Sequence, residues 1–216
     1  MKKIPTLFLR DYEHLITDFQ PQEASLMPDG GHELAGRIKD GKKGRFLATT
    51  QVTPGCEWVI NGEGIATRKW DGACCKVEDG VLYKRHDSKN GKTPPEGFMP
   101  AQEPDPVTGH WPGWLKVGDG PEDKYFREAF EDYKRLAMGI PFEGTFEALG
   151  PKINGNRDGF FHHVLMPHGK EELFDVPRDF EGLKKWLSWH KMEGIVFHHP
   201  DGRMCKIKRS DFGLKW

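Results

Sequence analysis

Residues 73–87, ACCKVEDGVLYKRHD, are the stretch that decides the fold. Two strand-like runs flank Asp79-Gly80, a dipeptide that tolerates the positive φ angles of a tight hairpin turn. Residues 194–209, GIVFHHPDGRMCKIKR, repeat this arrangement around Asp201-Gly202. The sequence therefore predicts two antiparallel hairpins, one near the middle of the chain and one near its C-terminal end.

Further short strands are expected before and between the hairpins. The runs RFLATTQV (45–52), CEWVI (56–60), GIATRK (64–69) and FEGTFEALG (142–150) are each bounded by Gly, Pro or Asn. Residues 88–120 are rich in Pro and Gly, which predicts a long loop without regular structure, and a loop of that length inside a compact domain is usually functional or mobile.

Two amphipathic helices are also predicted. The first follows Pro121, has Glu122 and Asp123 in its opening turn and stops at Gly139. The second begins at a capping Asp179. Their apolar positions recur at helical spacing and are Phe126, Ala129, Phe130, Tyr133 and Leu136 in the first helix, and Phe180, Leu183, Trp186 and Leu187 in the second. The fold class is therefore α+β, with mixed, largely antiparallel sheets and flanking helices.

Length and composition limit the class of protein. The chain has 216 residues, 30% charged and 12% aromatic, with a net charge of −1. These values are typical of a globular domain and argue against a disordered chain, a membrane protein or a protein that coats nucleic acid indiscriminately. The basic start MKKIPTLFLRDYEHL is too short and too charged for a signal peptide or a membrane span. We expect a cytoplasmic protein, with an undefined N-terminal segment (1–45) and one domain (46–216).

The cysteines show no recognisable spacing. They lie at positions 56, 74, 75 and 205 without a CxxC motif, so the sequence predicts reduced, partly buried thiols and neither a zinc ribbon nor a disulfide framework. The pairs His162-His163 and His198-His199 also argue against a metal site, because adjacent residues of a strand point to opposite faces.

Candidate chemistry centres on Lys69 in TRKWDGACC (67–75). Alone, a lysine beside a turn is usually a solvated charge. Glu147 lies in an apolar strand, Glu193 precedes another, and Lys206 and Lys208 share one face of a third because the side-chain period of a strand is two. Either these carboxylates and lysines simply pair on a wet sheet face, or the two lysines share an anionic ligand.

Four of these segments carry a family resemblance. KWDG (69–72) resembles motif I, the KxDG box, of the covalent nucleotidyltransferases, which include DNA ligases, RNA ligases and mRNA capping enzymes. FEALG, EGIVF and KIKR resemble motifs III, IV and V in the correct order. From about residue 46 onward, WDGACC, GHWPGW, GPKINGNRDG, LMPHG, MEGIVFHHPDG and KIKRSDFGLKW further resemble the vertebrate 5′-3′ RNA ligase family with its microbial and viral relatives.

The resemblance implies an activity and a fold. It implies the nucleotidyltransferase (adenylation) fold without a C-terminal OB domain, ATP as cosubstrate and Mg²⁺ or Mn²⁺ as cofactor. The activity would be joining of RNA 5′-phosphate and 3′-hydroxyl ends in RNA repair, by a monomer that needs no protein partner or membrane. A GTP-dependent capping-type enzyme, a DNA ligase and a non-catalytic RNA-end-binding module remain alternatives.

The resemblance also implies roles for the charged residues. Lys69 would attack the α-phosphate of ATP and form a lysine-AMP intermediate. Lys206 and Lys208 would disfavour the ammonium form of Lys69 and neutralise charge on the phosphate. Glu147 would contact the ribose or a metal-bound water, and Glu193 would hold the metal ion near the phosphate.

Further nucleotide contacts follow from the same resemblance. Asp71 and Gly72 would shape the turn after the nucleophile, with a water-mediated metal contact open to Asp71. Arg85 would reach the nucleotide or the 5′-phosphate, with a surface salt bridge as the alternative. Phe161 is a candidate for stacking on adenine, and core packing explains it equally well. Arg68 departs from the family pattern, because many relatives carry Glu immediately before the nucleophilic lysine.

Overall fold

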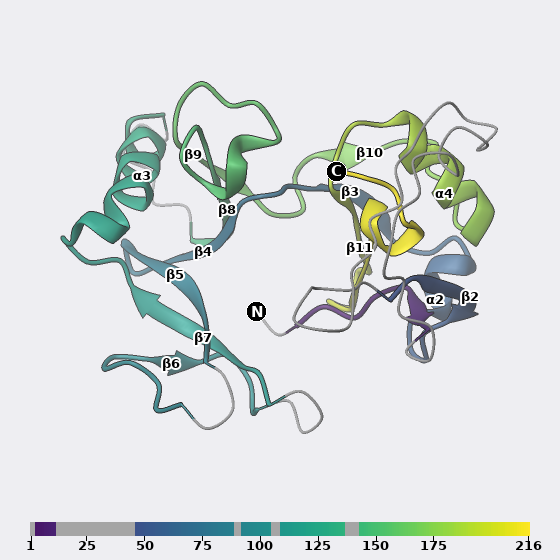
Figure 1. Cartoon of the computed structure of the whole chain (residues 1–216), viewed down its shortest axis with the longest axis horizontal. Helices are drawn as coiled ribbons and strands as arrows, with labels where there is room; N and C mark the ends of the chain where they lie inside the picture. The colour runs from purple at the N-terminus through teal and green to yellow at the C-terminus, as the bar shows by residue number, and fades with distance from the viewer. Residues whose placement is uncertain (1–2, 12–45, 89–91, 105–108, 137–142) are drawn as a thin grey trace, which may run out of the picture. The chain divides into compact units, whose positions relative to one another are not determined.

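The computed structural model describes residues 3–11, 46–88, 92–104, 109–136 and 143–216 (Figure 1). It divides into two compact units. The first unit consists of Met1–Lys3 and Trp70–His168, and the second of Ile4–Lys69 and Gly169–Trp216. The chain therefore passes from one unit to the other between Lys69 and Trp70, inside the KWDG segment.

The first unit is built on a six-stranded sheet whose paired neighbours are all antiparallel. In spatial order its strands are β6 (Met99–Pro100), β7 (Trp111–Lys116), β5 (Val81–Ser88), β4 (Ala73–Glu78), β8 (Gly144–Leu149) and β9 (Val164–Pro167). The predicted hairpin around Asp79-Gly80 is confirmed, since β4 pairs with β5 and both turn residues have positive φ, 51° and 70°.

The Pro-rich segment 88–120 is more regular than predicted. It contributes β6 and β7, and β7 pairs along β5 from Trp111↔Ser88 to Lys116↔Tyr83. The prediction of an irregular loop was therefore wrong for this part. The physical reason is that Trp114 is buried and the Trp111 indole N–H donates to the Gln102 carbonyl at 2.9 Å, so the aromatic residues fix the strand despite Pro112.

One face of this sheet carries the core of the first unit. A short 3-10 turn (η1, Pro121–Asp123) leads into α3 (Lys124–Leu136), which confirms the first predicted helix; Gly139 lies outside the described residues. Figure 1 shows α3 beside β8 and β9. The buried cluster includes Cys75, Val77, Leu82, Ala129, Phe146, Ala148, Ile153 and Leu165. Residues of β4 and β8 adjacent to these, such as Cys74 and Glu147, therefore lie on the opposite face.

The second unit contains a four-stranded antiparallel sheet and a small two-stranded one. The larger sheet has the order β10 (Glu172–Leu173), β3 (Ile65–Lys69), β11 (Gly194–His198) and β12 (Met204–Lys208). The smaller sheet pairs β1 (Phe8–Arg10) with β2 (Ala48–Val52). The hairpin of β11 and β12 confirms the prediction around Asp201-Gly202.

The core of the second unit lies against one face of its larger sheet. Ile195, Phe197, Cys205 and Ile207 pack with Leu183 and Leu187 of α4 (Phe180–Trp189). The start of α4 is as predicted, because the Asp179 carboxylate accepts the Gly182 backbone N–H at 2.8 Å. The C-terminal end of β12 continues into the short η3 (Arg209–Phe212).

Two predictions fail in this unit. CEWVI forms a short helix, α2 (Glu57–Ile60), because Trp58 and Val59 both enter the core, which a helical turn allows and a half-buried strand does not. Cys56 and Cys205 form a disulfide, with Cα atoms 6.3 Å apart, so these two thiols are not reduced as predicted. Their separation of 149 residues hides the pairing from any spacing rule.

The fold class is confirmed at the level of a mixed α+β chain with largely antiparallel sheets. Most of the predicted N-terminal segment 1–45 lies outside the described residues. Its described part includes β1; Phe8 of β1 and the preceding Leu7 belong to the core of the second unit. Within the described ranges, every helix is too short or too polar to cross a lipid bilayer.

Candidate functional site

The second unit gathers four of the predicted residues on the polar face of its sheet. Lys69, Gly194 and Lys208 occupy one row across β3, β11 and β12, and Thr67, Val196 and Lys206 occupy the next. Because side chains alternate along a strand, Lys69, Lys206 and Lys208 point to the same side, away from the apolar core. The strand register therefore brings the three lysines onto one face, as the period-two pattern predicted for Lys206 and Lys208.

Glu193 stands immediately before β11 and joins two of these lysines. Its carboxylate accepts a hydrogen bond from Lys69 Nζ, and its other oxygen lies 2.6 Å from Lys208 Nζ. Gly194 is required beside it, since a Cβ at this position would collide with the Ile207 carbonyl oxygen. Glu193 is only 8% exposed, so the carboxylate is held by two cations in a largely dry setting.

The pKa values of Glu193 and Lys206 are both lowered in this cluster, but burial opposes the shift in Glu193 and contributes to it in Lys206. Burial raises the pKa of the Glu193 carboxyl, but the ammonium groups of Lys69 and Lys208 offset this effect and hold the pKa below its usual value. Burial, together with Lys208 and Lys69, lowers the pKa of Lys206 from 10.5 to about 8. Asp211 and Glu193 act in the opposite direction. At neutral pH the cluster therefore holds one carboxylate and an excess of positive charges that repel one another.

We expect Lys206→Met to stabilise the protein below pH 8. The folded state binds the Lys206 proton less tightly than the unfolded state, so the charged lysine costs free energy below the folded pKa of about 8. At about 1.4 kcal/mol per pKa unit, a fall from 10.5 to about 8 gives a cost of roughly 3 to 4 kcal/mol at most. The cost shrinks as pH rises from 8 to 10.5, where both states become neutral.

Chemical denaturation of wild type and Lys206→Met across this pH range checks the expectation. The variant should be more stable near neutrality, and its advantage should fall as pH rises. Lys208→Met is the matched control, because it removes a lysine that pairs with Glu193 and should lower stability. A stability difference between Lys206→Met and wild type that does not change with pH would contradict this account of Lys206.

In the first unit, Glu147 is fixed by hydrogen bonds. Its Oε1 accepts the Gly72 backbone N–H at 3.0 Å, and its Oε2 lies 2.9 Å from His168 Nε2. Only glycine fits at position 72, since a Cβ would collide with the Ala148 carbonyl oxygen. The KWDG segment is thus tied to β8 through glycine. Glu147 is 8% exposed and points to the sheet face opposite α3.

Asp71 is buried in a turn that it organises. Its two carboxylate oxygens accept hydrogen bonds from Asn154 Nδ2 at 2.5 Å and Arg157 Nη1 at 2.9 Å. Its backbone N–H donates to Asp158 Oδ2 at 2.9 Å. Because both oxygens are already engaged, this geometry fits the predicted shaping of the turn better than a metal contact.

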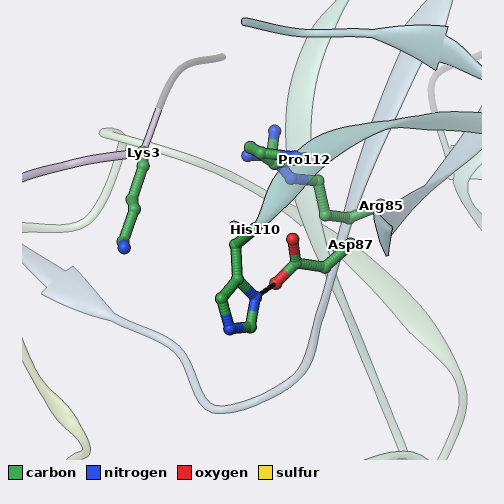
Figure 2. A pocket seen from close by; sticks show the side chains of 5 residues that line it. All are labelled: Lys3, Arg85, Asp87, His110 and Pro112. Carbon is green, nitrogen blue, oxygen red and sulfur yellow. Dashed lines mark hydrogen bonds and ion pairs between the residues drawn. The ribbon is translucent and has the colours of Figure 1, made fainter. Parts of the chain in front are cut away.

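Arg85 lies on the same sheet face as Glu147, next to a pocket. The pocket of about 320 Å³ is lined by Lys3, Arg85, Asp87, His110 and Pro112 (Figure 2). His110 Nδ1 contacts Asp87 Oδ2 at 2.6 Å, and the Arg85 guanidinium lies over the Trp114 ring at 5.1 Å. Burial lowers the pKa of Arg85, whose charge nevertheless persists at neutral pH. Arg85 is therefore a partly desolvated cation beside an open pocket.

Phe161 and Arg68 are the remaining predicted residues. Phe161 is 90% exposed and precedes β9, so it is neither in the strand after Glu147 nor in the core. The residue that β9 places opposite Glu147 is Met166. Arg68 pairs with Glu171, at 3.4 Å between Nη1 and Oε1. Since Arg68 adjoins Lys69 in β3, its side chain leaves the sheet on the other side from the lysine cluster.

The donors expected for Mg²⁺ fit such an ion only in part. Glu147 and Glu193 offer carboxylate oxygens of the kind that Mg²⁺ prefers. However, Glu193 already binds two lysines, and Glu147 has a histidine beside it. Among the described residues, the three-donor cluster able to hold a metal ion is Cys74, Glu147 and His168, which mixes sulfur, oxygen and nitrogen.

Sequence reasoning missed His168. It follows β9 in the segment LMPHG, which served only for the family resemblance. Its backbone N–H donates to the Thr145 carbonyl at 3.1 Å, which extends the pairing of β8 and β9 by one residue and aims the ring at Glu147. A histidine one residue beyond a strand gives no signal in the sequence, because the pairing of that strand is not visible there.

Comparisons with known proteins point to ligases. A family model described as RNA ligase 1 matches residues 138–216. The chain is 27% identical over 250 aligned residues to RNA ligase 1 of Danio rerio, covering 83% of this chain and 77% of that protein. It is 27% identical to RNA ligase 1 of Pongo abelii and of Mus musculus, each covering 70% of this chain and 68% of that protein.

The class that these comparisons support is that of a ligase enzyme. More particularly, they confirm the resemblance to an RNA ligase family that the ordered motifs indicated.

Proposed function

We propose that the chain is an ATP-dependent RNA ligase that joins RNA 5′-phosphate and 3′-hydroxyl ends, with a role in RNA repair. The observation that carries this proposal is the cluster in which Glu193 holds Lys69 and Lys208, with Lys206 on the same sheet face. A structural ion pair needs one lysine for one carboxylate. Three lysines around a single buried carboxylate instead favour an anionic ligand such as a nucleoside triphosphate.

Lys69 is the proposed nucleophile. Its ammonium group would first lose one proton; the neutral amine would then form a bond to the α-phosphorus of ATP while the bond to the pyrophosphate oxygen breaks, and the nitrogen would lose a second proton as the phosphoramidate forms. Attack requires that Lys69 release its hydrogen bond to Glu193, which favours the charged form. Lys206 and Lys208 favour the neutral amine by repulsion and would neutralise charge that develops on the phosphate oxygens.

The remaining steps transfer AMP. The RNA 5′-phosphate oxygen would attack the lysine-AMP phosphorus and release Lys69, and an RNA 3′-hydroxyl would then displace AMP as the new phosphodiester forms. Glu147, held rigidly by Gly72, would contact the ribose. Mg²⁺, when bound through Glu193 or Glu147, would neutralise phosphate charge. Arg85 and its pocket provide a cationic surface for a phosphate group.

Incubation with α-labelled ATP or GTP tests the proposal. We expect covalent, acid-labile label from ATP and little from GTP, followed by joining of 5′-phosphorylated RNA. Label from GTP alone would favour a capping-type enzyme, and joining of DNA alone would favour a DNA ligase. Absence of any covalent label would favour a non-catalytic RNA-end-binding module.

A further inference from the structure

A mixed-donor cluster lies on the polar face of the first unit's sheet. One ligand atom each from Cys74, Glu147 and His168 lies within 4.8 Å of the other two. The strand register explains the convergence. Cys74 of β4 stands directly opposite Glu147 of β8, and Met166 of β9 stands opposite Glu147 on its other side. His168 is two residues beyond Met166 and so points to the same face.

Two of the three donors are already held in place. The Glu147 carboxylate is fixed by the Gly72 N–H and by His168 Nε2. The other ring nitrogen, His168 Nδ1, is buried and finds no hydrogen-bond partner among the described residues. A buried imidazole nitrogen without a partner is costly, so its presence needs an explanation. Coordination of a cation through Nδ1, with Nε2 remaining beside Glu147, would provide one.

The third donor is a thiol outside the disulfide. Cys74 is partly exposed, whereas its neighbour Cys75 is buried on the core side, where burial raises the pKa of its thiol well above the usual value. Cys74 therefore faces the carboxylate and the imidazole from an accessible position, and Cys75 does not. Sulfur and nitrogen donors select borderline-soft cations such as Zn²⁺, while Mg²⁺ prefers oxygen alone.

We propose that Cys74, Glu147 and His168 bind a zinc ion. Bonds of about 2.0 to 2.3 Å place the ligand atoms of a tetrahedral zinc site roughly 3.5 Å apart, so the cluster needs only a small contraction. Binding replaces the Cys74 thiol proton with the metal, and this proton goes to solvent; His168 binds as a neutral imidazole through the lone pair of one ring nitrogen and keeps a single N–H on the other. Three protein ligands leave the fourth position open.

Zinc at this site would inhibit the ligase. This consequence rests on the proposed function, in which Glu147 must be available to the nucleotide ribose. A zinc ion that uses the Glu147 carboxylate removes it from that role while the lysine cluster of the second unit remains intact. We therefore expect micromolar zinc to suppress covalent labelling by ATP and a chelator to restore it.

Cobalt, which replaces zinc and absorbs visible light, tests the site without any activity assay. The metal-stripped full chain should bind one Co²⁺ with thiolate charge-transfer and tetrahedral absorption bands, and Zn²⁺ should displace it. Cys74→Ser and His168→Ala should each lose these bands and bind zinc at least about tenfold more weakly. Cys75→Ala and His163→Ala are matched controls, since His163 pairs with Glu128 in the same unit, and both should keep the bands.

The outcomes separate this site from the proposed function. Absence of the cobalt bands in wild type, or bands unchanged in Cys74→Ser that retains its thermal unfolding transition, would overturn the site. If Cys74→Ser is labelled by ATP both without and with added zinc, the inhibitory role is supported. If added zinc does not change the labelling of wild type, that role is overturned. Failure of wild type to label in zinc-free buffer would refute the proposed function while the cobalt result still decides the metal site.

Discussion

Lys69→Arg should reduce covalent labelling by ATP on the order of 10³-fold or more, the scale expected for loss of a nucleophile. Arginine keeps the positive charge and the pairing with Glu193, so the polar face of the sheet and the fold should persist. The guanidinium cannot lose its proton in a protein and cannot attack phosphorus. The variant therefore separates the role of Lys69 as a cation from its role as a nucleophile.

Labelling with α-labelled ATP, followed by denaturing electrophoresis, measures this loss. Lys134→Arg on α3 is the matched control, because Lys134 also pairs with a carboxylate, that of Glu131, but both side chains lie on the exposed face of this helix in the other unit. It should label like wild type. Thermal unfolding of Lys69→Arg should also match wild type. Undiminished labelling of a folded Lys69→Arg would eliminate Lys69 as the nucleophile.

Glu193→Gln should lower both the rate of covalent labelling by ATP and the free energy of unfolding. The isosteric amide removes the charge that holds Lys69 and Lys208, so three lysines are left on one sheet face without their buried carboxylate. Misplacement of the reacting group by about 1 Å can cost about 100-fold in rate, and we expect a loss of that order. Removal of one partner from a buried charge cluster should lower the free energy of unfolding by up to about 3 kcal/mol.

Glu171→Gln is the control for Glu193→Gln. Glu171 pairs with Arg68, the residue adjoining Lys69, but it is half exposed and lies on the other side of the sheet. A single partly exposed pair at 3.4 Å contributes about 0 to 1 kcal/mol, so stability and labelling should change little. Equal effects of the two substitutions, measured by denaturant unfolding and by labelling rate, would show that Glu193 has no special role.

The sequence predicted the parts of this fold that depend on local rules. Asp79-Gly80 and Asp201-Gly202 specify hairpins because Asp79, Gly80 and Gly202 adopt the positive φ that the turns require, and Asp179 specifies a helix start because its side chain caps the first turn. The shared face of Lys206 and Lys208 follows from strand periodicity alone. These features need no knowledge of what packs against them.

Features that depend on distant partners were missed. CEWVI is helical because its Trp58 and Val59 fill the core of the second unit, which the run itself does not reveal. Cys56 and Cys205 meet across 149 residues, and His168 meets Cys74 through the order of three strands. The exposure of Phe161 likewise depends on where β9 begins. Finding these features requires the register of each strand pair and the order of the strands in each sheet.

The most direct test of the central claim is mass spectrometry of the full chain after incubation with ATP and Mg²⁺. The account predicts a mass increase of one adenylyl group, located by peptide mapping on Lys69 within TRKWDGACC. It also predicts that RNA with a 5′-phosphate and a 3′-hydroxyl removes this group. A chain whose mass does not change, or an adenylyl group on a different lysine, would contradict the account.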